Sequence, residues 1–163
     1  MRRIGITGLH ADPFIHTGHI NLLRDGKSIV EHLIVILSND NQCLSKHGYC
    51  AISEKDRKEI LLSNKYVDEV IISSDIDSSQ IKTLSLLREK YPNDILIYLK
   101  GGDRSDFSNL NQKELEICAK HNIMVCVGVG GYSKEASISD ITEKVYNGIS
   151  KRQNCSSSNT CDS

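Results

Sequence analysis

The stretch that decides the fold is RIGITGLHADPFIHTGHINLL, residues 3–23. It opens with a short β-branched run, continues through a loop rich in histidine, and ends in an apolar pattern of helical period. A hydrophobic core gains nothing from the three imidazoles of His10, His16 and His19. The loop is therefore either a ligand site or a polar surface turn, and the rest of the chain decides between these.

Composition narrows the classes of protein to consider. The chain has 163 residues, near the commonest size of one domain, and 39% of them are hydrophobic. Twenty basic side chains against twenty-one acidic ones leave a net charge of −1. This balance argues against a surface for duplex nucleic acid, while a local pocket for a small anion stays possible.

The chain carries no sign of secretion or membrane insertion. Met1, Arg2 and Arg3 lead straight into the first strand-like run without the apolar stretch of a signal peptide, so we expect a cytoplasmic protein. The six cysteines form no C-x-x-C pair. We expect reduced thiols and no zinc or other metal site built from side chains.

β-branched runs alternate with helical patterns along the chain. The runs predict five strands, at residues 3–7, 32–38, 69–73, 94–99 and 123–129. Helices are predicted at residues 18–30, 53–63, 78–90, 111–121 and 137–150, with Ser53 and Asp56 resembling a capping box. The nearly continuous apolar character of the strands indicates a sheet that is covered on both faces.

This order predicts one α/β domain over residues 1–150, a Rossmann-like doubly wound fold with a five-stranded parallel sheet flanked by helices. Ligands bind such folds at the carboxyl ends of the strands, and the loops expected there are rich in Gly, Lys, Arg, His and Asp. Residues 151–163 lose all apolar periodicity, so we expect a disordered tail.

His16 and His19 bracket Gly18 where the first loop enters a helix. Backbone N–H groups of a first helical turn face any anion that lies over it, and the helix dipole adds to the attraction. Gly18 allows a phosphate to approach the backbone closely. A single histidine here would more often be a surface group, but two around a glycine favour a phosphate site.

These residues resemble a known signature. The H-x-G-H pattern, preceded by Asp12-Pro13, is similar to that of the nucleotidylyltransferase superfamily of cytidylyltransferase-like enzymes. The resemblance continues in order through residues 38–40, 46–48, 52–61, 67–70, 100–103 and 128–139. The Lys-Gly-Gly-Asp at residues 100–103 is similar to that of heptose-phosphate adenylyltransferases.

The resemblance implies transfer of CMP or AMP from CTP or ATP to a small phosphorylated alcohol or sugar, with pyrophosphate released. It implies that His16, His19 and Lys46 are catalytic, that Mg²⁺ accompanies the triphosphate, and that the protein is a homodimer. The residues expected to bind nucleotide are Thr7, Gly8, Gly18, Arg57, Lys100, Gly101, Gly102, Asp103, Lys134, Ser137 and Ser139.

The first loop departs from the usual pattern, because it is about two residues longer between Gly8 and His16. His10 lies in this longer part, and we expect a mild effect of replacing it unless the loop folds back over the nucleotide. A nucleotide-binding regulatory module without turnover is the alternative. A dinucleotide-dependent oxidoreductase is disfavoured, since no G-x-G-x-x-G follows the first strand.

Overall fold

The computed structural model describes residues 1–101, 107, 110–131 and 138–157, with only the backbone described for residues 138–139 and 151–157. Five parallel strands form one sheet in the order β3-β2-β1-β4-β5. The strands are β1 Arg3–Leu9, β2 His32–Leu37, β3 Glu69–Ile72, β4 Ile95–Gly101 and β5 Met124–Val129. The predicted α/β class is therefore confirmed.

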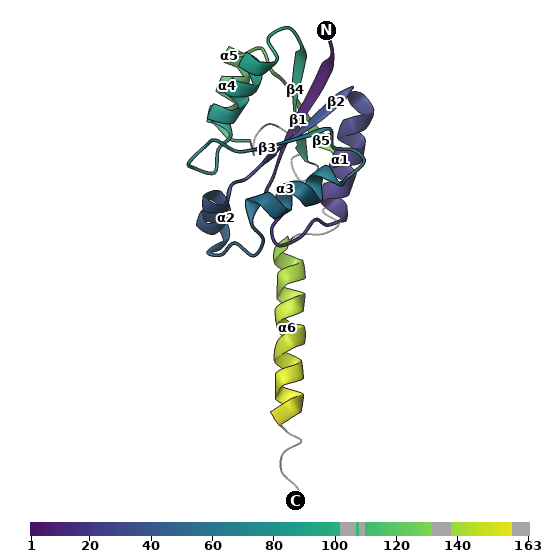
Figure 1. The fold of residues 1–163 in the computed structure, drawn as a ribbon, viewed down its shortest axis with the longest axis vertical. Helices are drawn as coiled ribbons and strands as arrows, with labels where there is room; N and C mark the ends of the chain where they lie inside the picture. The colour runs from purple at the N-terminus through teal and green to yellow at the C-terminus, as the bar shows by residue number, and fades with distance from the viewer. Residues whose placement is uncertain (102–106, 108–109, 132–137, 158–163) are drawn as a thin grey trace, which may run out of the picture.

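Helices cover both faces of the sheet (Figure 1). The bounds of the helices are α1 Thr17–Ile29, α2 Asp40–His47, α3 Glu54–Leu62, α4 Ile81–Lys90, α5 Gln112–Lys120 and α6 Ile138–Ser157. Within the described ranges, none of them is both long and apolar enough to span a membrane.

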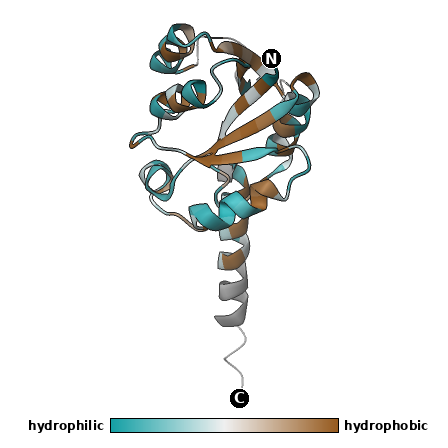
Figure 2. Ribbon diagram, turned by 45° about the horizontal axis from the view of Figure 1, so that its top comes forward, coloured by the Kyte–Doolittle hydropathy of each residue, from teal (hydrophilic) through white to brown (hydrophobic). Residues whose placement is uncertain are grey.

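The core forms two layers because alternate strand residues point to opposite faces. In β2, Leu33 and Val35 pack with α1 and α3, whereas Ile34 and Ile36 pack with α4 and α5. All four side chains are fully buried. Figure 2 shows the resulting hydrophobic sheet between helices whose outer faces are hydrophilic.

Two expectations about helices are wrong. Residues 40–47, expected in a loop, form α2, whose first turn is capped reciprocally by Asn39 and Gln42 with N···O distances of 2.9 and 3.1 Å. Gly48 ends this helix at a φ of 77°. In addition, α6 continues to Ser157, seven residues beyond the predicted end at residue 150. The rest of the expected tail, residues 158–163, lies outside the described residues.

The order of the strands reverses between β1 and β4, which opens a crevice above their carboxyl ends. On one side of this edge the turn after β5 touches α1. A Cβ at Gly130, whose φ is +89°, would lie 2.7 Å from the backbone nitrogen of Leu22. This contact fixes the distance between the end of β5 and the start of α1.

We therefore expect Gly130→Ala to destabilise the protein more than Gly131→Ala. Both residues have positive φ, which costs an L-residue about 1–2 kcal/mol, but a Cβ at Gly131 meets open space. Urea unfolding of the two variants measures the difference. Equal losses of unfolding free energy would show that the backbone of α1 moves aside freely.

Candidate active site

The lengthened first loop is tied to the segment between α2 and α3. Asp12 is fully buried, and its Oδ1 accepts hydrogen bonds from the backbone N–H groups of Ala51 and Ile52 at 3.1 and 2.9 Å. Ala11 has a φ of 53°, a left-handed conformation that L-residues seldom adopt. The loop is thus held in a defined shape rather than left as a surface turn.

Arg57 in α3 is buried in the middle of this arrangement, with 0% of its side chain exposed. Its guanidinium donates to the carbonyl oxygens of Ile52, His10 and Ser38 at 2.9, 2.6 and 2.8 Å. It also binds Oδ1 of Asp40 at 2.7 Å. In this structure the guanidinium is thus bound to four protein oxygens and holds the surrounding segments together, and its expected role of clamping phosphates stays a prediction.

The histidine pair lies at the entrance of α1. His16 is the N-cap residue, and its backbone N–H donates to Nδ1 of His19 at 3.3 Å. The two rings stack with centroids 3.8 Å apart. Because Nδ1 of His19 accepts this bond, the proton of the neutral ring lies on Nε2, which is left to donate to a ligand.

The electrostatics of the pair favour neutral rings. Burial, the neighbouring His16 and the charge of Lys46 lower the pKa of His19 to about 4. Burial also lowers the pKa of His16, whose Nδ1 is buried without a partner in the described part of the chain. Neutral imidazoles beside the N–H groups of a first turn are hydrogen-bond donors suited to a phosphate.

His10 belongs to the same cluster. Its pKa is lowered to about 3, first by burial and then by the charges of Lys46, His47, Arg57 and His19. From the sequence we expected only a mild effect of replacing His10, and the extra length of its loop was the one sign of a larger role. The fold places this residue beside α2.

Lys46 lies in the last turn of α2, and its charge lowers the pKa values of His10, His19 and His47. The catalytic role expected for Lys46 stays a prediction. The helix that carries Lys46 was not predicted, although Asn39, Gln42 and Gly48 are recognisable cap residues.

Lys100 takes a different position from the expected one, because β4 continues through it. Its Nζ lies 2.8 Å from Oε2 of Glu114 and 2.6 Å from the hydroxyl of Tyr98. Only 15% of the Lys100 side chain and 6% of the Glu114 side chain are exposed. In this structure the ammonium group is paired with Glu114 of α5, and the expected contact of Lys100 with the nucleotide stays a prediction.

Some of the other predicted site residues are among the described residues, and the rest are not. Thr7 is buried in β1, and Gly8 follows it, with the side chain of Gln80 filling the space that a Cβ at residue 8 would need. Gly18 lies in the first turn of α1, and Gly101 ends β4 opposite Val129. Gly102, Asp103, Lys134 and Ser137 lie outside the described residues, and only the backbone of Ser139 is described, in the first turn of α6.

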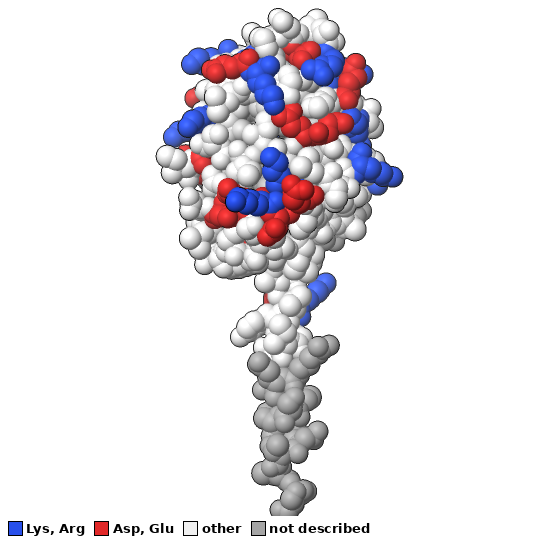
Figure 3. Space-filling view, viewed as in Figure 1, with Lys and Arg blue, Asp and Glu red and all other residues white. Residues whose placement is uncertain are grey.

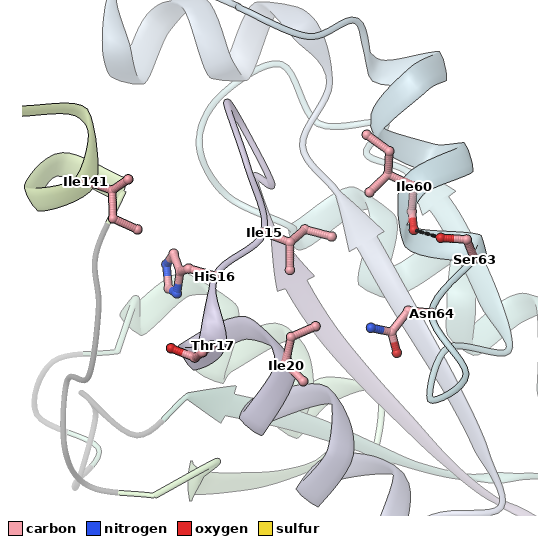
Figure 4. A pocket seen from close by; sticks show the side chains of 8 residues that line it. All are labelled: Ile15, His16, Thr17, Ile20, Ile60, Ser63, Asn64 and Ile141. Carbon is pink, nitrogen blue, oxygen red and sulfur yellow. Dashed lines mark hydrogen bonds between the residues drawn. The ribbon is translucent and has the colours of Figure 1, made fainter. Parts of the chain in front are cut away.

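His16 also lines an open pocket of about 650 Å³ (Figure 4). It is bounded by the start of α1, the end of α3 and the first turns of α6, so one face of the imidazole is open to a ligand. The remaining lining residues are Ile15, Thr17, Ile20, Ile60, Ser63, Asn64 and Ile141.

Positive and negative side chains are mixed on the surface of the domain. On the face shown in Figure 3, basic and acidic side chains alternate, including those of α3. Among the described residues, no group of three or more His, Cys, Asp and Glu side chains is arranged to hold a metal ion.

We expect Arg57→Lys to lower the free energy of unfolding by about 3 kcal/mol or more, the cost of disrupting a buried charge pair. Lysine keeps the charge but cannot bridge the four oxygens that the guanidinium reaches. Denaturant unfolding measures the loss, with the exposed Lys55→Ala in the same helix as the control. A loss no larger than that of the control would contradict the structural role of Arg57.

Stability should also depend on pH through the histidines. The pKa values of His10 and His19 are lowered to about 3 and 4, so the folded state stays unprotonated at pH 5. Unfolded histidines, with a pKa of about 6.5, take up roughly one proton each at that pH. Stability therefore falls as the pH decreases from 7 to 5, and His10→Gln should reduce this fall in urea titrations. An unchanged fall would contradict the lowered pKa of His10.

The fold and the site together define a parallel α/β domain of Rossmann type with a histidine pair at the entrance of its first helix. A family model described as cytidylyltransferase-like matches residues 12–159. The chain belongs to this family of nucleotidylyltransferases.

Several characterised relatives are similar to parts of the chain. An FAD synthase of Pyrococcus abyssi is 31% identical over 114 residues, which cover 69% of this chain and 72% of that protein. A glycerol-3-phosphate cytidylyltransferase of Bacillus subtilis is 42% identical over 57 residues, covering 35% of this chain and 44% of that enzyme. A probable nicotinate-nucleotide adenylyltransferase of Shewanella frigidimarina is 34% identical over 107 residues, which cover 62% of this chain and 50% of that protein.

The fold is also found in a solved structure. The lipopolysaccharide core biosynthesis protein from Thermoplasma volcanium superposes with a TM-score of 0.58 at 21% identity. The match covers 80% of this chain and 98% of that chain. At this identity the likeness concerns the fold.

Proposed function

We propose that this protein transfers CMP or AMP from CTP or ATP to a small phosphorylated alcohol or sugar and releases pyrophosphate. The observation that carries the proposal is the geometry of the histidine pair, in which Nδ1 of His19 accepts the His16 N–H and leaves Nε2 as a donor. Membership of the cytidylyltransferase-like family supports the same class of reaction. The relatives include both adenylyl and cytidylyl enzymes, so both nucleotides are retained.

In this reaction a phosphate oxygen of the acceptor attacks the α-phosphorus of the triphosphate in line, and the bond to pyrophosphate breaks. The attacking oxygen is already anionic, so the protein contributes mainly position and charge stabilisation. His16, His19 and the first N–H groups of α1 stabilise the α-phosphate, and Lys46 stabilises the reacting phosphates of the nucleotide and the acceptor.

The remaining contacts follow the family pattern. We assign Lys134, Ser137 and Ser139 to the β- and γ-phosphates, and Gly101, Gly102 and Asp103 to the nucleoside. Mg²⁺ is bound mainly by the triphosphate oxygens and water. The carboxylate of Asp12 already accepts two backbone hydrogen bonds, which is consistent with a metal ion held by the triphosphate rather than by this side chain.

Pyrophosphate release tests the proposal directly. The full chain is incubated with Mg²⁺, each of the four nucleoside triphosphates and a panel of phosphorylated acceptors. Release with CTP or ATP and an acceptor is the expected result. Nucleotide binding without pyrophosphate release would favour a regulatory module, and a response to GTP or UTP alone would contradict the assigned nucleotides.

We expect His16→Asn and His19→Asn to lower kcat by about a hundredfold or more, the effect of removing one preorganised donor. The KM for the triphosphate should change less, because the contact strengthens as charge develops on the α-phosphate. Steady-state kinetics measure kcat and KM, and thermal unfolding checks that the variants are folded. Near-normal turnover in folded variants would restrict the pair to a structural role.

We also propose a homodimer. The exposed side chains of Val145, Tyr146 and Ile149 lie on one projecting helix, α6, where a second copy would bury them (Figure 1). Light scattering of the full chain tests the assembly, and a strictly monomeric, active protein would contradict it.

A further inference from the structure

The lengthened part of the first loop places His10 against α2. Its Nδ1 lies 3.8 Å from the Sγ of Cys43, a residue with no exposed surface. Burial raises the pKa of the Cys43 thiol, so the sulfur keeps its proton and donates to Nδ1, which is a better acceptor than sulfur. Since burial also keeps His10 neutral, its own proton lies on Nε2.

His47 forms the second side of this arrangement. Its ring meets the ring of His10 edge-on, with centroids 5.7 Å apart and an interplanar angle of 80°. Its Nε2 is buried and has no hydrogen-bond partner in the described part of the chain. Buried polar atoms of this kind are usually paired with protein, water or ligand, so this nitrogen is a group that an anion could bind.

The surroundings are suited to an anion. Lys46, next to His47 in α2, lowers the pKa of His10, as do His47, Arg57 and His19. Arg57 is bound to Asp40, and the other acid facing the cluster, Asp12, accepts hydrogen bonds from Ala51 and Ile52. The ring contact between His10 and His47 thus joins the first loop to the last turn of α2, which also carries Lys46.

We propose that His10, Lys46 and His47 form a subsite for the phosphate group of the acceptor, separate from the pair His16 and His19 that serves the nucleotide. The assignment to the acceptor rests on the proposed nucleotidyl transfer. His10 and His16 both belong to the loop between β1 and α1, so the subsite lies at the same edge of the sheet as the histidine pair. Cys43 acts through His10 as a positioning residue.

The subsite can be tested without turnover, using inorganic phosphate as the probe. Histidine side-chain ¹H–¹⁵N spectra of the full chain should show His10 and His19 protonated at Nε2. Phosphate should then shift the signals of His10 and His47 in a saturable manner. His10→Ala should weaken phosphate binding about tenfold or more, while His121→Ala, in the cap of α5, should leave it unchanged.

Two variants of Cys43 separate positioning from packing. Cys43→Ser keeps a donor for Nδ1 and should retain phosphate binding, whereas Cys43→Ala should weaken it. Phosphate that shifts no signal of His10 or His47, or that binds equally to His10→Ala, would overturn the subsite whether or not the protein turns over.

Kinetics then show whether the subsite binds the phosphate of the acceptor or a phosphate of the triphosphate. With an acceptor that supports pyrophosphate release, His10→Ala should raise the KM of the acceptor about tenfold and leave the KM of the triphosphate within about twofold. A rise confined to the KM of the triphosphate would overturn the assignment to the acceptor, since the same group would then bind the nucleotide. Failure of pyrophosphate release in the unmodified protein would instead count against the proposed function, because the binding test does not depend on it.

Discussion

The site depends on one buried guanidinium. Arg57 links the first loop, the end of β2, α2 and the segment that precedes α3. It does so through hydrogen bonds to His10, Ser38, Asp40 and Ile52. A fully buried charge is tolerated only when its donors are satisfied, so these four segments have to keep their relative positions. The arrangement that brings His10 and α2 towards the histidine pair follows from this constraint.

A second consequence is that the histidines stay neutral next to Lys46. Burial lowers the pKa values of His10 and His19 to about 3 and 4, and each ring has a partner on Nδ1. The site therefore combines neutral imidazoles with N–H donors in fixed directions. Preorganised donors of this kind need little rearrangement when negative charge develops on a phosphate.

The contacts of two long cationic side chains differ most from those expected from the sequence. Arg57 and Lys100 stand in motif-like positions, and both bind carboxylates of the protein itself, Asp40 and Glu114. A motif fixes where a residue lies along a strand or helix, whereas the direction of a flexible side chain depends on partners from distant segments. Glu114 reaches Lys100 from α5, a contact that spacing along the chain does not contain.

The sequence by itself determined the alternation of strands and helices, the parallel sheet and the position of His16 and His19 at a helix entrance, because apolar periodicity and helix-entry chemistry are local. It also contained the cap residues of α2, Asn39 and Gly48, which are visible once the helix is known. The tertiary structure alone decided that Arg57 is buried and that the longer loop brings His10 to Cys43 and His47. These contacts join residues more than thirty positions apart, and their energies arise only when packing removes the groups from water.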